Sequence, residues 1–181
     1  MLANHLKNKE NFVMFKNLTT ARLAKMAMVA AIYAVLTILL PLSYGDVQFR
    51  IAEVLVLLCF YNKDYCVSLT LGCAIANLFS PFALIDVPVG SAATLIAVIL
   101  MWKCPNLYVA SLFPVITNGI LVGAELTYMY NTPFWLNAAS VAVGEFAVIC
   151  VAGVILFRTV LQRSEHFMKL IGNQKALKYK N

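Results

Sequence analysis

The chain has 181 residues, of which 62% are hydrophobic and only 12% are charged. Soluble globular domains have about 45–50% apolar and about 25% charged residues, so this chain has too little polar surface to cover a water-soluble particle, and lipid is its predicted solvent. The net charge of +6 does not indicate nucleic-acid binding, because the basic residues lie in short loops and at the chain ends rather than on one folded face.

Six apolar runs follow one another between a basic N-terminal segment, residues 1–21, and a basic tail, residues 162–181. They cover about residues 23–40, 49–61, 65–80, 89–102, 107–128 and 134–161. The stretch from Pro81 to Pro88 is predicted to be non-helical, because both prolines break a helix. We therefore predict a single all-α integral membrane domain over residues 1–181, with six transmembrane helices in a core over residues 22–161.

The second, third and fourth runs are shorter than the about 20 residues that a helix needs to cross about 30 Å of hydrocarbon. Either the bilayer is thinner around them, or their outer ends continue into irregular backbone that lines a cavity within the protein. The second alternative implies a pocket on one side of the membrane.

The uneven distribution of basic residues predicts the orientation in the membrane. With six spans, 13 of the 14 Lys and Arg residues fall on one side, and Arg50 alone falls on the other. Cytoplasmic loops carry the excess of Lys and Arg. Both termini and the turns at Lys63 and Lys103 are therefore predicted to be cytoplasmic, and the chain to be a multi-pass protein of the plasma membrane.

The sequence carries no recognisable catalytic motif. It has no G-x-x-x-x-G-K-[ST] phosphate loop, no histidine pair with metal-ligand spacing and no Ser/His/Asp set within the apolar runs. The five cysteines form no C-x-x-C pair and are interpreted as small apolar residues. We expect no enzymatic activity, no bound metal and no cofactor.

Polar side chains within the apolar runs are the candidates for function, because ionisable groups are costly in a membrane. They are Arg50, Glu53, Asn77, Asn118, Glu125 and Glu145, with Asp46 and Asp86 in the outer loops. Asn118 and Glu125 are seven residues apart and so share one helix face. The aromatic residues Tyr44, Phe49, Tyr128, Tyr130 and Trp135 cluster at the outer boundary.

Structural roles remain open for several of these residues. Arg50 and Glu53 could form an ion pair, the aromatic residues could be an interfacial belt, and Asn77 could cap a helix. Glu125 and Glu145 fit such roles poorly, since two acids with one nearby cation leave charge uncompensated; they indicate contact with a ligand or a coupling proton. Carboxylates, amides and aromatic faces together suit a flat heterocycle rich in N–H donors, such as a guanine-like edge.

Four strings carry a family resemblance: QFRIAE at residues 48–53, GCAIANLFSP at 72–81, DVPVGSAAT at 86–94 and VAVGE at 141–145. Together they resemble the QueT family of substrate-binding S components of energy-coupling factor (ECF) transporters, over about residues 23–161. Ala52 departs from the serine expected there, in a position with no charged role.

The resemblance implies a six-helix S component that captures a queuosine precursor from outside, a deazapurine such as 7-aminomethyl-7-deazaguanine or queuine. It implies a coupling subunit, EcfT, and two ATPase subunits as partners. The substrate-binding residues it implies are Arg50, Glu53, Asn77, Asp86, Asn118, Glu125 and Glu145, with Tyr128 or Trp135 stacking on the ring. Docking of the coupling subunit would use Ala27, Ala30, Ala31 and Ala34, although such spacing serves packing within a chain equally well.

Two alternatives remain open. One is an S component for another vitamin-like small molecule. The other is a solitary proton-coupled carrier, in which Glu125 and Glu145 would handle protons. The sequence shows no inverted repeat of the kind that builds many such carriers.

Overall fold

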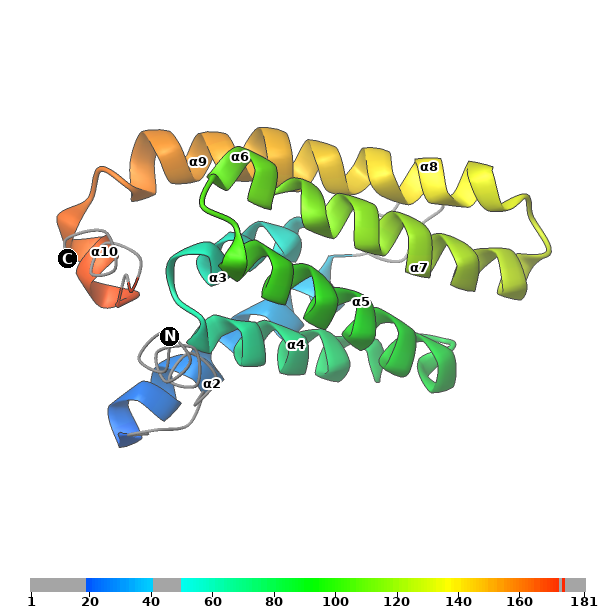
Figure 1. The fold of residues 1–181 in the computed structure, drawn as a ribbon. Coiled ribbons are helices and arrows are strands. Elements are labelled where there is room, and N and C mark those ends of the chain that lie inside the picture. The colour runs from blue at the N-terminus through cyan, green and yellow to red at the C-terminus, as the bar shows by residue number, and fades with distance from the viewer. Residues whose placement is uncertain (1–18, 41–49, 173, 175–181) are drawn as a thin grey trace, which may run out of the picture.

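A computed structural model describes residues 19–40, 50–172 and 174 of the chain (Figure 1). This part is helical and contains no β-strand. Its elements are α2 (Thr20–Leu39), the 3₁₀-helix η3 (Ile51–Leu57), α3 (Leu58–Tyr61), α4 (Asp64–Asn77), α5 (Ala83–Lys103), α6 (Leu107–Ala110), α7 (Leu112–Tyr130), α8 (Phe134–Glu145), the π-helix η4 (Phe146–Gly153), α9 (Val154–Leu156), the π-helix η5 (Phe157–Leu161) and α10 (Glu165–Leu170). Three residues of the predicted outer boundary, Tyr44, Asp46 and Phe49, lie outside the described residues.

Four helical stretches within the described ranges are long and apolar enough to cross a membrane. They are Thr20–Leu39, Ala83–Lys103, Leu107–Tyr130 and Phe134–Leu161. This confirms the prediction of an all-helical membrane protein. The two other predicted spans correspond to shorter helical segments, Ile51–Tyr61 and the 14 residues of α4, so length and composition identify four spans rather than six.

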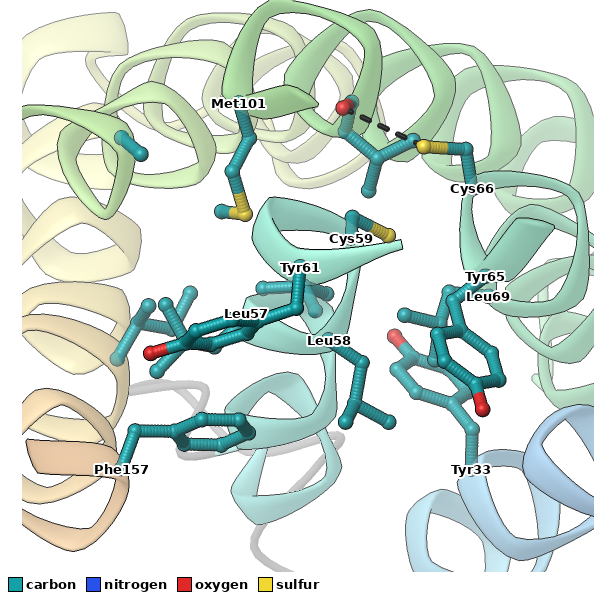
Figure 2. Packing of buried hydrophobic residues seen from close by; sticks show 14 of the residues in the cluster. Tyr33, Leu57, Leu58, Cys59, Tyr61, Tyr65, Cys66, Leu69, Met101 and Phe157 are labelled. Atoms are coloured by element: carbon teal, nitrogen blue, oxygen red, sulfur yellow. Dashed lines mark hydrogen bonds between the residues drawn. The ribbon is translucent and has the colours of Figure 1, made fainter. Parts of the chain in front are cut away.

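The short second segment runs through the interior of the bundle. Side chains of η3 and α3, among them Leu57 and Tyr61, are buried against α2, α4, α5 and the last long helix (Figure 2). The Tyr61 ring stacks on Phe157 with 5.8 Å between centroids. Protein surrounds most of this segment, although Ile51 at its start is exposed. Its buried part needs little contact with lipid and does not have to match the hydrocarbon thickness.

One end of the bundle collects the start of α2, the turn between α3 and α4, and α10 (Figure 1). Arg22 at the start of α2 forms a bidentate ion pair with Asp64, in which its Nε donates to Oδ2 over 2.6 Å. Asn62 Nδ2 donates to the carbonyl oxygen of Ile171 over 2.8 Å. These contacts hold three chain segments that are distant in sequence at the end that carries Lys63.

Small residues allow two pairs of helices to approach closely. A Cβ added at Gly72 of α4 would lie 2.8 Å from the carbonyl oxygen of Ala30 in α2, and one added at Gly123 of α7 would lie 2.8 Å from Cα of Ala138 in α8. Ala30 and Ala34 are therefore buried within the chain, whereas Ala27 and Ala31 are exposed.

The prediction of a non-helical stretch from Pro81 to Pro88 was wrong over most of its length. Helix α5 begins at Ala83 and includes Pro88, so the irregular connection from α4 is confined to residues 78–82. Pro88 lies near the start of the helix, where its missing N–H removes a single bond. Close to the proline, Asn77 Nδ2 donates to the carbonyl oxygen of Asp86 over 2.8 Å and ties the start of α5 to the end of α4.

Candidate functional site

A small cavity of about 60 Å³ lies at the end of the bundle opposite the Arg22–Asp64 pair. The start of η3, the connection between α4 and α5, and the last turns of α7 form its walls. Its lining residues are Arg50, Ser80, Pro81, Phe82, Asp86, Val122, Glu125, Leu126, Met129 and Tyr130. Three of the sequence-predicted residues, Arg50, Asp86 and Glu125, thus come together around one space.

Helix α7 contributes one continuous face to this cavity. Val122, Glu125, Leu126, Met129 and Tyr130 follow the i, i+3, i+4, i+7, i+8 spacing of a single helix stripe. The same spacing excludes Tyr128, which projects from a different side of α7.

Asn118, one turn before Val122 on α7, connects the site to the last helix. Its Nδ2 donates to Glu145 Oε1 over 2.8 Å, and both side chains are buried. The second carboxylate oxygen of Glu145, Oε2, has no hydrogen-bond partner among the described residues. Glu145 is the last residue of α8, directly before the π-helix η4, and such departures from α-helical geometry are frequent at functional sites.

Glu53 is held by a residue that the sequence interpretation missed. The hydroxyl of Tyr33, in the middle of α2, donates to Glu53 Oε1, and both residues are fully buried. Arg50 makes no ion pair with Glu53 within the part of the chain that the structure describes. The signal for Tyr33 was a polar hydroxyl in the centre of an otherwise apolar run.

Asn77 and Asp86 order the wall between α4 and α5. Gly90 leaves room for the Asn77 amide, since an added Cβ there would lie 2.4 Å from Nδ2. The hydroxyl of Ser80 donates to Asp86 Oδ2. The carboxyl group of Asp86 is thereby fixed at the edge of the cavity.

Four buried polar atoms around this end have no partner within the described residues: Arg50 Nε, Asn77 Oδ1, Glu125 Oε1 and Glu145 Oε2. An unsatisfied buried polar atom costs about 1–3 kcal/mol, and two of the four belong to Arg50 and Glu125, which line the cavity, so they indicate a ligand there; Asn77 and Glu145 do not line it. Three of the four are acceptors, which suits a ligand rich in N–H donors. The carboxyl groups of Glu53, Asp86, Glu125 and Glu145 outnumber the single guanidinium of Arg50, which also favours a cationic group.

The two aromatic residues proposed to stack on a ligand lie away from the cavity. Tyr128 is 78% and Trp135 is 81% exposed, and neither lines it. Tyr130 and Phe82 line it instead, and their rings pack edge to face with centroids 6.0 Å apart. Among the described residues no group of His, Cys, Asp and Glu has a geometry that could hold a metal ion.

Comparison with known proteins identifies one family. The model of the QueT transporter family matches residues 23–162. A protein of Lactococcus lactis subsp. cremoris (strain MG1363) named queuosine precursor transporter QueT is 34% identical over 159 residues, which cover 78% of this chain and 93% of the relative. No solved structure matches the chain.

Proposed function

Because the chain belongs to the QueT transporter family, it is a membrane transport protein rather than an enzyme, and we propose that it is the substrate-binding S subunit of an ECF importer in the plasma membrane. Its substrate is a queuosine precursor, as the name of the Lactococcus relative suggests. A deazapurine such as 7-aminomethyl-7-deazaguanine or queuine fits the site chemistry.

The observation that carries this proposal is that two residues lining the cavity, Arg50 and Glu125, each bear a buried polar atom without a partner among the described residues. Asn77 and Glu145, which do not line it, bear two more. A carboxylate can accept two adjacent N–H donors of a guanine-like edge, and Glu125 and Glu145 each keep one oxygen without a partner. The Asn77 and Asn118 amides form hydrogen bonds with the remaining edge of the ligand, and the Arg50 guanidinium donates to a ligand carbonyl. Tyr130 is better placed than Tyr128 or Trp135 to contact the ring.

The cavity is smaller than the proposed substrate requires. Pockets for small organic ligands occupy about 300–1,000 Å³, and the cavity measures about 60 Å³. Binding of a deazapurine therefore requires its walls to move apart. The walls on α7 and on the α4–α5 connection carry long or aromatic side chains, such as Met129 and Phe82, whose rotation provides part of that space.

The decisive experiment identifies the ligand. Protein purified from a medium with each candidate deazapurine would be denatured, and the released small molecules identified by mass spectrometry. Release of a deazapurine supports the proposal, whereas release of an unrelated vitamin indicates an S component of other specificity. Transport by the chain alone in proteoliposomes, without ATP, indicates a solitary carrier instead.

The orientation is proposed from the charge asymmetry: six membrane crossings, with both termini in the cytoplasm. In a cysteine-free background, a cysteine at Asn131, in the turn between α7 and α8, should react with an impermeant maleimide added outside cells. Cysteines at Lys63 or Lys103 should not. External labelling at Lys63 contradicts this topology.

The proposed partners are EcfT and two ATPase subunits. Ala27 and Ala31 form a small-residue pair on the exposed face of α2 that would let a partner helix approach closely. Ala27→Leu or Ala31→Leu should weaken co-purification of the coupling subunit and leave ligand binding intact. Ala34→Leu is not a suitable control, because Ala34 is buried within the chain.

A further inference from the structure

Helix α4 is shorter than the hydrocarbon layer of a membrane. Its 14 residues rise about 21 Å at 1.5 Å per residue, which is about 9 Å less than the roughly 30 Å of hydrocarbon. The uncharged stretch between Asp64 and Asp86, however, is 21 residues long, which is enough to cross. The residues that follow Asn77 directly, including the irregular connection of residues 78–82, are uncharged up to Asp86.

Every backbone N–H of this connection has a hydrogen-bond partner. The N–H groups of Phe79 and Ser80 donate to the carbonyl oxygens of Ala76 and Asn77, both over 3.1 Å. The N–H of Phe82 donates to the Ser80 hydroxyl over 3.2 Å, and Pro81 has no N–H. Irregular backbone within a bilayer is tolerated only where its polar groups are satisfied by protein or water, and the N–H donors of this segment meet that condition.

The side chains of the connection separate into a polar inner face and an apolar outer face. Ser80 turns inward and donates to Asp86 at the cavity. Phe79 is 66% exposed and Leu84, at the start of α5, is 94% exposed. Leu71 and Ile75 on α4 and Leu78 at the start of the connection are also exposed, so exposed apolar side chains occur on both the helix and the connection.

An apolar hollow on the outside of this region adds a third observation. It measures about 310 Å³ and is lined by Pro81, Phe82, Ala83, Leu84 and Ile85, none of which is ionisable. A hollow without charged groups suits hydrocarbon chains and suits a water-exposed loop poorly, because large exposed apolar patches on soluble surfaces are rare.

We propose that the α4–α5 connection lies within the hydrocarbon of the membrane, with lipid acyl chains packed on Phe79, Leu84 and the hollow beside them. Pro81 and Phe82 then form a thin wall with lipid on one side and the polar cavity on the other. The cavity lies below the level of the lipid headgroups, and one of its walls can move only by displacing acyl chains.

The test uses tryptophan fluorescence of the full chain in phosphatidylcholine vesicles with brominated acyl chains. Trp102 and Trp135 are first replaced by phenylalanine, and a single tryptophan is introduced as Phe79→Trp or Leu84→Trp. Glu165→Trp in the same background is the water-exposed control, since its side chain is 88% exposed in α10. A chain with Trp135 alone reports a third exposed position, at the start of α8.

We expect brominated acyl chains to quench Phe79→Trp and Leu84→Trp several-fold more than Glu165→Trp, and aqueous iodide to quench in the opposite order. Strong iodide quenching of both loop variants places the connection in water and overturns the proposal. Protection from both quenchers shows that protein covers it, either a second copy or a partner, and overturns the proposal as well. Having two loop positions keeps the test valid if one variant does not fold, and none of these outcomes depends on which substrate is bound.

Discussion

Glu145→Gln tests the site at its deepest carboxylate. In the wild-type chain Oε1 accepts from Asn118 Nδ2 over 2.8 Å, and Oε2 has no partner. The glutamine carbonyl oxygen can keep the bond to Asn118, while the new NH₂ group replaces Oε2 and presents a donor to a donor of the ligand. Only the ligand-facing half of the side chain is therefore changed, and the shape is nearly unchanged.

The expected cost is that of leaving buried donors unpaired, about 1–3 kcal/mol, or roughly a fivefold to hundredfold loss of affinity. A charged ligand amine would increase it. Calorimetric titration with the deazapurine, in nanodiscs, measures the dissociation constant, and thermal unfolding checks the fold. Glu165→Gln, on the exposed helix α10, is the matched control and should bind as the wild type does. Wild-type affinity of Glu145→Gln would refute the reasoning that Oε2 accepts from the ligand.

Three further predictions concern helix packing and energy coupling. Gly90→Ala puts a Cβ 2.4 Å from Asn77 Nδ2, so the amide must turn away. Calorimetry should show a loss of about 1 kcal/mol in the free energy of ligand binding. Unchanged binding would exclude a role for Asn77. In Gly123→Ala the new Cβ lies 2.8 and 2.9 Å from backbone atoms of Ala138, so thermal unfolding should show a destabilisation of about 1–3 kcal/mol. Gly119→Ala is the control, because its nearest contact is at 3.4 Å, and it should not destabilise the chain. Equal effects of the two changes would contradict the packing described. The purified chain alone should bind ligand without hydrolysing ATP, and an ATPase activity that a point change in this chain removes would contradict the assignment as a binding subunit.

Several features of the site were visible in the sequence because they depend on composition within one helix. An acid or amide in an apolar run is conspicuous wherever it occurs, so Asn118, Glu125 and Glu145 could be selected as candidates without a structure; of the three, Glu125 lines the cavity. Their shared burial follows from the cost of exposing such groups to hydrocarbon. The helix period also placed Asn118 and Glu125 on one face of α7.

The partners of these groups could not be predicted in the same way. Spacing along a helix fixes which residues share its face, but it does not fix which neighbouring helix that face meets. The bonds from Tyr33 to Glu53 and from Asn118 to Glu145 join residues 20 and 27 positions apart, and they depend on helix packing. Tyr130 rather than Tyr128 lines the cavity, because the face of α7 that meets the α4–α5 connection is the one that carries Val122 and Leu126.

The sequence by itself determined the solvent and the class of protein: a chain with 62% hydrophobic and 12% charged residues must bury its surface in lipid, and lipid requires helices or closed barrels that satisfy their own backbone. Only the tertiary structure decided which helices face lipid and which face protein. The segment Ile51–Tyr61 is apolar in sequence like a span, yet it is packed inside the bundle, and α5 includes Pro88 although proline disfavours a helix. In both cases contacts with neighbouring helices outweigh the local preference, because in a membrane packing and polar satisfaction come from segments that are distant in sequence.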